Sequence, residues 1–568
     1  MIPRLALVSD WPEAKPLPPG IALLASIGAA RLIGAPATSV RMTGKVALVG
    51  FAFYRAGPRP CEAVTPREAD AIVEGCGEWA VRNLWGNFLL FWSDDDATYL
   101  LRSPMTGPAI FQVARDRREG DAATPSACVF TDLAIARALG FALDRIDPAA
   151  VDARLRFLSL RSPPCELAGV NEVLPGEVAR LGAAGRCAAS WSPWRFVERP
   201  PRNPEPHALR DVVSRTISAW SGRFERIQLE LSGGIDSSIV AACLAGRSRP
   251  WRGFTLATSD PDGDERPYAR AVAERIGVSL GEGFRPPAGD PIAPLPNLRV
   301  RPGGFGLLGP SDAVYLEAAR AYGAEAILTG TGGDNVFGYM TSTAPIVDAL
   351  RFAGPFAAWR AARDLSQLAN DNIWKALGYS ARRMIVTPPL WPVDASLLSD
   401  RYAGTRPTHP WIDTARRVAP GQQHYALRLL VSQPFVDGFD RALALPMIAP
   451  LLSQPIVEFT LGVPSWHWGE GGLNRAFARR AFAGDLPRKV IERTSKGRIL
   501  SAYLPAYEQY RVALRPFLLD GWLAGERLLD VDAIDVLLSG REHADATAMA
   551  RILGFADMER WARAIVGR

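Results

Sequence analysis

The chain has 568 residues, 48% of them hydrophobic and 22% charged, a composition that excludes an intrinsically disordered protein. The formal net charge of +6 is small for this length, so we expect no nucleic-acid partner. The apolar stretch at residues 21–33 is interrupted by Arg31 and is too short to cross a bilayer, and the N-terminus lacks the order of a signal peptide. We therefore expect a cytoplasmic protein without a membrane span.

Short apolar runs separated by turn residues fill the first third of the chain, and this alternation predicts β-rich layers. The runs lie at residues 46–53, 88–92, 98–102, 128–131 and 177–181. Residues 147–158 have a helical pattern between them. The proline-rich residues 199–206 follow, and they cannot continue a helix or a central strand. We therefore predict a first domain over residues 1–200 that ends at a linker.

Beyond this linker, strand-like and helical runs alternate, which is typical of an α/β domain with a parallel sheet. The strand-like runs are residues 227–231, 253–256 and 326–329, and the helical runs are residues 237–245, 267–276 and 312–322. From about Ser342 the pattern is helical and rich in arginine. We predict a second domain over residues 207–568, and the expected fold class is α/β plus α+β.

The clearest motif follows the first of these strands, where residues 232–238 have the sequence Ser-Gly-Gly-Ile-Asp-Ser-Ser. Gly233 and Gly234 let the backbone approach an anion closely, because no Cβ intervenes. Amides at the start of the following helix point at such an anion. Asp236 would repel a bare phosphate, so it is best explained as a Mg²⁺ ligand beside phosphates. The hydroxyl donors of the loop are those of Ser232, Ser237 and Ser238.

This run resembles the pyrophosphate-binding loop of the N-type ATP pyrophosphatases, the asparagine synthetase superfamily. A second strand leads into residues 330–338, Gly-Thr-Gly-Gly-Asp-Asn-Val-Phe-Gly, which resemble the second acidic loop of that superfamily. The resemblance implies ATP and Mg²⁺ as cofactors, Asp334 as the second metal ligand and Gly332 beside the nucleotide. It also implies that backbone atoms around Leu256 contact the adenine. Carboxylates at the C-terminal ends of two parallel strands can share a metal ion in the crevice there.

Near the C-terminus, residues 491–497, Ile-Glu-Arg-Thr-Ser-Lys-Gly, resemble the superfamily's Arg-x-x-Lys-Gly segment, which brings a lysine over the active site. Lys496, one of only five lysines among 65 basic residues, lies at that position. The resemblance implies that Lys496 stabilises developing negative charge and forms the catalytic set with Asp236 and Asp334. The alternative is an ordinary lysine at a solvated helix end.

The first domain resembles the class II glutaminase domain of asparagine synthetases, an Ntn-type β-sandwich. The resemblance rests on residues 85–92, 101–111, 129–132 and 173–177. That glutaminase uses an N-terminal cysteine whose free α-amine helps to activate its own thiol. This chain opens with Met1-Ile2-Pro3, and removal of Met1 would expose a side chain without a nucleophilic atom. We expect a retained scaffold that releases no ammonia.

The superfamily activates a carboxylate with ATP as an acyl-adenylate, and an amine then displaces AMP. Asparagine synthetases usually carry Glu at the position of Thr331, and β-lactam synthetases carry a Tyr there that pairs with a distant Glu. Thr331 cannot deprotonate an amine at neutral pH, so the proton acceptor is not identified. The α-amine of a peptide, with a reference pKa near ~7.7–8.0, needs less help from a base.

These points favour a lasso peptide macrolactam cyclase, which would adenylate an Asp or Glu side chain of a precursor core peptide and join it to the peptide's N-terminal amine. The expected partners are that precursor peptide, a leader peptidase and a leader-binding protein. The alternatives are a β-lactam-type or other small-molecule amide synthetase, an ammonia-dependent asparagine synthetase, and a binding module with an inactive site.

Two segments depart most from the superfamily's motifs, residues 284–310 and residues 352–394. They would form a wider peptide cleft, or their tryptophans are ordinary core. Residues 304–309 fit a Gly-x-Gly-x-x-Gly pattern, but they run into Pro310, so we expect no helix and no dinucleotide site there. The tryptophans concerned are Trp359, Trp374 and Trp391.

Overall fold

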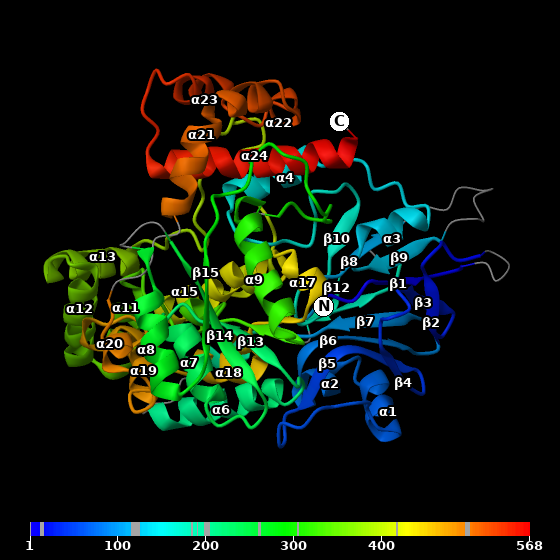
Figure 1. The fold of residues 1–568 in the computed structure, drawn as a ribbon, viewed down its shortest axis with the longest axis horizontal. Coiled ribbons are helices and arrows are strands. Elements are labelled where there is room, and N and C mark those ends of the chain that lie inside the picture. The colour runs from blue at the N-terminus through cyan, green and yellow to red at the C-terminus, as the bar shows by residue number, and fades with distance from the viewer. Residues whose placement is uncertain are drawn as a thin grey trace.

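The computed structural model describes residues 2–11, 16–114, 125–182, 186–189, 191–197, 205–258, 263–303, 306–415, 418–494 and 500–567. It confirms the expected mixed fold at the level of its sheets: antiparallel sheets in the first part of the chain and a parallel sheet in the second (Figure 1). Among the described residues, no helix has the length and apolar character needed to cross a membrane.

Two six-stranded antiparallel sheets form the N-terminal part, in the orders β10-β8-β9-β1-β3-β2 and β12-β11-β7-β6-β5-β4. The first contains β1 (Leu5–Val8), β2 (Ala22–Ile27), β3 (Ala30–Gly34), β8 (Phe111–Ala114), β9 (Ala127–Phe130) and β10 (Val170–Glu172). The second contains β4 (Val40–Thr43), β5 (Val46–Tyr54), β6 (Leu84–Ser93), β7 (Thr98–Arg102), β11 (Glu177–Arg180) and β12 (Arg186–Ala189). Leu7 and Val129 of the first sheet share a core with Val49 and Phe91 of the second, so the two sheets pack as a sandwich.

Five helices accompany these sheets within the described residues: α1 (Pro66–Glu74), α2 (Glu78–Asn83), α3 (Leu133–Ala138), α4 (Pro148–Arg156) and α5 (Trp194–Val197). The predicted helix at 147–158 is α4. It starts after Asp147, whose carboxylate accepts from the backbone amides of Ala149 and Ala150 and so satisfies helix-terminal donors. The predicted strands at 46–53, 88–92, 98–102, 128–131 and 177–181 are confirmed as β5, β6, β7, β9 and β11.

A five-stranded parallel sheet, in the order β15-β14-β13-β16-β17, forms the centre of the second part. Its strands are β13 (Ile227–Glu230), β14 (Trp251–Ala257), β15 (Leu280–Phe284), β16 (Ala326–Leu328) and β17 (Met447–Ile448). The helices between them are α7 (Ile235–Leu244), α8 (Arg266–Ile276) and α9 (Gly309–Tyr322), which confirms the predicted alternation. The sequence did not indicate β15, which contains two glycines, or β17, which has only two residues.

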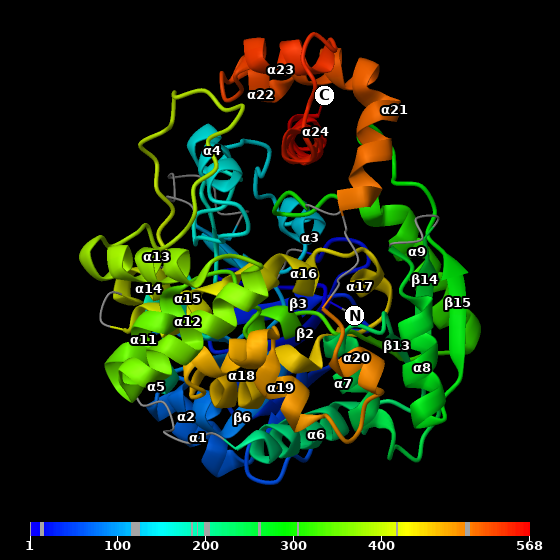
Figure 2. The same ribbon diagram turned by 90° about the vertical axis from the view of Figure 1, so that its left-hand side faces the viewer.

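The remaining regular elements are helices, and the helical pattern expected from Ser342 on is found except in β17 and in residues 386–409, which form no helix. The helices are α6 (Pro206–Ser221), α10 (Gly333–Val336), α11 (Ala344–Ala353), α12 (Pro355–Ala369), α13 (Ile373–Ile385), α14 (Pro410–Thr414), α15 (Pro420–Arg428), α16 (Gln433–Asp437), α17 (Arg441–Ala444), α18 (Gln454–Leu461), α19 (Ala476–Ala481), α20 (Arg488–Ile491), α21 (Leu500–Leu519), α22 (Trp522–Gly525), α23 (Val531–Leu538) and α24 (Ala546–Val566). Helices α21–α24 lie together at one end of the molecule (Figure 1, Figure 2).

The N-terminal part packs tightly on the rest of the chain. Val151 and Leu155 of α4 share a core with Ile552 and Leu553 of α24. On the second sheet, Phe53 stacks on Trp85, and the Trp220 ring of α6 meets Phe53 edge to face with centroids 4.9 Å apart. The two parts are therefore joined by shared hydrophobic cores, which supports a structural role for the sandwich.

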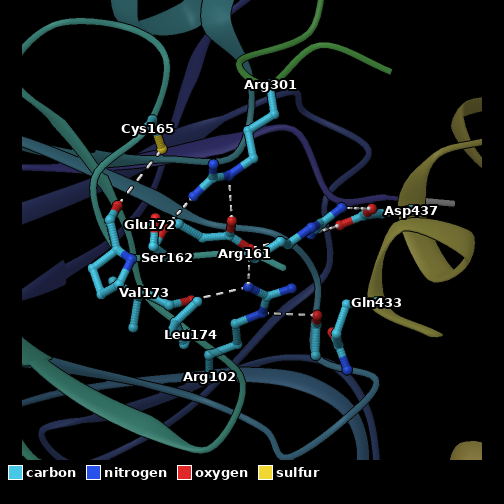
Figure 3. A network of polar contacts seen from close by, with 12 residues as sticks. Arg102, Arg161, Ser162, Cys165, Glu172, Val173, Leu174, Arg301, Gln433 and Asp437 are labelled. Carbon is cyan, nitrogen blue, oxygen red and sulfur yellow. Dashed lines mark hydrogen bonds and ion pairs between the residues drawn. The ribbon is translucent and has the colours of Figure 1, made fainter. Parts of the chain in front are cut away.

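A buried ion network strengthens this junction (Figure 3). Glu172 of β10 accepts from Arg102 of β7 at 2.7 Å, from Arg161 at 3.2 Å and from Arg301 at 2.6 Å. Arg161 also pairs with Asp437 of α16 at 2.6 Å. Burial alone would raise the pKa of Glu172, but Arg161, Arg301 and Arg102 hold it well below its ordinary value. The network ties the sandwich to α16 and to residues 289–303.

Of three further sequence-based expectations, one is not tested, one is wrong and one holds in part. Most of the predicted linker lies outside the described residues, so the domain boundaries at 200 and 207 stay a prediction. The expectation of no helix at Pro310 is wrong, because α9 begins at Gly309 with Pro310 in its first turn, where the missing N–H costs nothing. Trp391 is buried and donates to the Leu158 carbonyl, whereas Trp359 and Trp374 are 45% and 67% exposed. The core interpretation therefore holds for one tryptophan of the three.

Candidate active site

The glycine-rich loop lies at the C-terminal end of β13, the middle strand of the parallel sheet, and opens α7. Ser232 Oγ accepts from the Gly234 amide at 3.3 Å and lies 3.2 Å from Ser237 Oγ, so the hydroxyls fix the shape of the loop. Gly233 has φ +71°, and a Cβ there would lie 2.4 Å from the Ala269 amide nitrogen. A side chain at this position would clash with the first turn of α8, and it would also keep an anion away from the backbone, so glycine is required.

Ser238 differs from the other two serines. Its side chain is fully buried, and its Oγ has no hydrogen-bond partner among the described residues. Its predicted contact with the nucleotide stays a prediction, as does that of Leu256, which is 5% exposed in β14.

The second acidic loop follows β16, the neighbour of β13, and packs directly against the first. A Cβ on Gly333 would lie 2.5 Å from Cβ and Cγ of Asp236, and one on Gly330 would lie 2.7 Å from the Ser237 amide nitrogen. Gly332 has φ +82°, and a Cβ there would collide with Leu452. The glycines of residues 330–338 thus let the two loops touch.

Arg475 joins the two acidic side chains. Its Nη1 donates to Asp236 Oδ2 at 2.8 Å and to Asp334 Oδ1 at 2.6 Å, so both carboxylates reach one atom. Arg475 precedes α19, has φ +60° and is 7% exposed. Burial alone would lower its pKa, but Asp236 and Asp334 raise it. The structure therefore brings together the two residues predicted as metal ligands.

Further cations surround this centre. Burial lowers the pKa of Arg479 to about 10, with Arg475 and Arg493 adding to the effect, so Arg479 stays charged at neutral pH. Burial lowers the pKa of Arg428, and Asp334 opposes that shift. His424 lies on the same helix, α15, and burial, with Arg428 and Arg383, lowers its pKa to about 4, so its imidazole is neutral. A positive field of this kind favours a polyphosphate.

Lys496 lies outside the described residues, but the segment that leads to it makes several contacts with the site. Arg479 donates to the carbonyls of Val490 and Arg493. The Arg493 guanidinium lies 4.0 Å from the centre of the Tyr268 ring and 3.0 Å from Glu265. Tyr268 is the residue whose backbone packs against Gly233. Residues 490–494 therefore lie beside the glycine-rich loop.

The donor set fits Mg²⁺ and ATP. Two carboxylates converge at the C-terminal edge of the parallel sheet, and hard oxygen ligands are what Mg²⁺ prefers. Among the described residues, no group of three or more His, Cys, Asp or Glu side chains could hold a metal ion. Mg²⁺ held by Asp236 and Asp334 would thus take its other ligands from phosphate oxygens and water.

Sequence reasoning named both acids and noted Arg475 only in the stretch that leads to Lys496, without giving it a role. Arg475 is 239 residues from Asp236 and 141 from Asp334, and the sequence did not indicate that it reaches either acid. The only available signal was its position a few residues before Arg479, in the region that leads to Lys496.

Residues 208–563 match the family model described as asparagine synthase. A search of curated proteins gave no relative of the chain. The matched range contains both acidic loops and Arg475, and the family forms amide bonds with ATP, typically with Mg²⁺. An ATP-dependent carbon–nitrogen ligase agrees with the two carboxylates and the cations around them. Since the match covers well over half of the 568 residues, the chain belongs to the asparagine synthase family.

Proposed function

We propose that the protein is a lasso peptide cyclase, which closes a macrolactam between an Asp or Glu side chain of a core peptide and the peptide's N-terminal amine. The observation that carries the proposal is the convergence of Asp236 and Asp334 on Arg475 beside the glycine-rich loop. A carboxylate oxygen of the peptide attacks the α-phosphorus of ATP and pyrophosphate leaves. The amine then attacks the acyl carbon, loses a proton, and AMP leaves.

The chain's own residues have distinct tasks in this scheme. The glycine-rich loop and its serines bind the departing pyrophosphate, and Mg²⁺, when bound by Asp236 and Asp334, supplies neutralisation of phosphate charge. Lys496 stabilises the developing oxyanion, and one well-placed donor of this kind is worth roughly 3–4 kcal/mol. Holding acid and amine of one molecule together makes the second step unimolecular, worth up to about 7–11 kcal/mol.

The N-terminal end of the sandwich packs against the ligase part. A small cavity of about 50 Å³ lies beside Ile2, with Asn87 and Gly107 in its wall, and its described lining includes no cysteine. The Ile2 amide nitrogen donates to the Ala442 carbonyl of α17, so this end of the sandwich is closed by the ligase part. In the proposed scheme this part acts as a scaffold, and the amine comes from the substrate itself.

The test is to incubate the purified protein with ATP, Mg²⁺ and the peptide encoded beside its gene, together with the leader peptidase and leader-binding protein. We expect AMP, pyrophosphate and a peptide product one water lighter than the cut core. Formation of asparagine from aspartate and ammonia would refute the proposal in favour of an asparagine synthetase. Cyclisation of a small β-amino acid in place of the peptide would favour a β-lactam-type synthetase.

The absence of ATP–pyrophosphate exchange with any carboxylate, despite nucleotide binding, would instead indicate a binding module. A parallel assay with Lys496→Ala and with Asp334→Asn separates chemistry from binding, because the first variant should bind Mg²⁺ and ATP normally and the second should not.

A further inference from the structure

A large cavity lies apart from the candidate active site. It has a volume of about 610 Å³ and lies between residues 289–303, α9, α17 and α24. No residue of 232–238 or 330–338 lines it. This volume falls within the range of small-molecule and cofactor sites. Its apolar wall is formed by Leu295, Ala313, Leu316, Phe439, Leu443 and Trp561.

One carboxylate in this cavity lacks a full set of partners. Asp557 of α24 has a side chain only 13% exposed, and its nearest cation, Arg560, is 3.6 Å away. Within the described part of the chain, no hydrogen bond to the Asp557 carboxylate occurs. Arg560 directs its Nε to the Ala293 carbonyl instead. Burial raises the pKa of Asp557 to about 7, which agrees with an incompletely satisfied charge.

Of the glycines in the 304–309 pattern, which the nucleotide site does not use, this pair explains Gly306. A Cβ on Gly306 would lie 2.6 Å from Arg560 Nη1 and 2.7 Å from Asp557 Oδ1. Glycine at this position lets the pair lie against the backbone of the segment before α9.

The balance of charge in the lining favours a cation. Arg299 pairs with Asp440 at 2.8 Å, Arg441 pairs with Asp312, and Arg301 is neutralised by Glu166 and Glu172. What is left is Arg560 facing two acids, Asp557 and Asp290. A carboxylate that is only partly paired in a largely apolar cavity attracts a positively charged hydrogen-bond donor.

The cavity is connected to the active site through one strand. Arg441, in the cavity wall, pairs with Glu230 at 2.5 Å. Glu230 ends β13 and lies two residues before Ser232 of the glycine-rich loop. The wall of the cavity is therefore tied to the strand that carries the glycine-rich loop.

We propose that this cavity binds a remote part of the peptide substrate, an apolar side chain next to an ammonium group, with Asp557 as the acceptor. Binding energy from such a part contributes to positioning at the reacting centre. The inference rests on the proposed peptide substrate for its biological ligand, whereas the chemistry of the cavity does not depend on that substrate.

The first test uses 2-phenylethylammonium as a probe and phenylacetate as its anionic counterpart, with thermal unfolding of the full chain as the readout. We expect the ammonium, and not the carboxylate, to raise the Tm. The variant Ala313→Trp, which fills the cavity from α9, should lose this shift. Glu274→Trp places the same side chain at an exposed position of α8, which contributes no residue to the cavity lining, and should keep the shift.

Asp557→Asn provides a second variant that keeps the shape of the cavity and should also reduce the shift. An equal shift in wild type and Ala313→Trp, or a preference for phenylacetate, would overturn the proposal. In the peptide assay, Ala313→Trp should raise KM for the peptide by about tenfold or more with little change in kcat. If the wild type cyclises no peptide while the probe still binds, the proposed function fails and the cavity assignment stands.

Discussion

The clearest consequence of the structure concerns Arg475, the cation between the two acidic loops. Replacing it by methionine keeps most of the side-chain volume but removes a guanidinium that donates to both Asp236 and Asp334. Two like charges would then remain close together with side chains only 15% and 33% exposed. Their repulsion and poor solvation destabilise the folded state.

The magnitude follows from these contacts. Breaking a buried ion pair by removing one partner costs about 3–5 kcal/mol. Asp334 is a third exposed, so solvent screening reduces its share, and we expect about 3 kcal/mol for Arg475→Met. A cation that binds the folded state restores stability according to its saturation, about 2.7 kcal/mol at a hundred times its Kd. Because Arg475 competes with Mg²⁺ for the same oxygens, the variant should gain more from Mg²⁺ than the wild type.

The assay is thermal unfolding with and without Mg²⁺, without nucleotide. The matched control is Arg480→Met on α19, whose arginine is 44% exposed and pairs with Glu470, and which should change stability by no more than about 1 kcal/mol. Adding Asp236→Asn and Asp334→Asn to Arg475→Met should abolish the Mg²⁺ effect. An Arg475→Met protein as stable as the wild type, or an equal gain from Mg²⁺ in both, would refute the reasoning.

Four further outcomes are expected. The variant Gly333→Ala should fold, but its rate of ATP–pyrophosphate exchange should fall about a hundredfold, because the new Cβ displaces Asp236. Full activity would show that the two loops can move apart without loss. Lys496→Ala should retain ATP binding and lose amide formation by roughly 10²–10³-fold; unchanged turnover would remove it from the mechanism. Glu172→Gln should cost about 3–5 kcal/mol in denaturant unfolding. Because the pKa of Glu172 is lowered, its contribution to stability is present at neutral pH and is lost only well below pH 4. A loss of this contribution already at pH 5–6 would contradict the prediction. The pKa of Asp557 is raised from 3.8 to about 7, so the free energy of unfolding should fall by up to about 4 kcal/mol as the pH rises between these values. Asp557→Asn should flatten this pH dependence in thermal unfolding. An unchanged pH dependence in the variant would show that another group causes it.

Local signals were enough to predict most elements that have a clear period. The strand at 98–102 coincides with β7, and Asp147 caps α4 where the pattern placed a helix start. By contrast, β17 consists of Met447 and Ile448 alone and exists because these residues pair with β16. Such a strand has no period to detect, since its definition is a contact with a distant segment.

The candidate site likewise combines features that local sequence indicates with contacts that only the fold creates. Glycines and acids within residues 232–238 and 330–338 form local turns at strand ends, so their sequence indicated a phosphate and metal site. Whether the two loops meet depends on strand order, and the parallel pairing of β13 with β16 decides that they do.

The sequence by itself thus determined the alternation of strands and helices, the two acidic loops and membership of an ATP-dependent amide-forming family. Only the tertiary structure decided that Arg475 reaches across 239 residues to join the acids, that α24 packs on α4, and that Arg301 enters a buried network with Glu172. The physical reason is that turns and helix caps are set by neighbours along the chain. Ion pairs and shared cores depend on where the whole fold places groups that are distant in sequence.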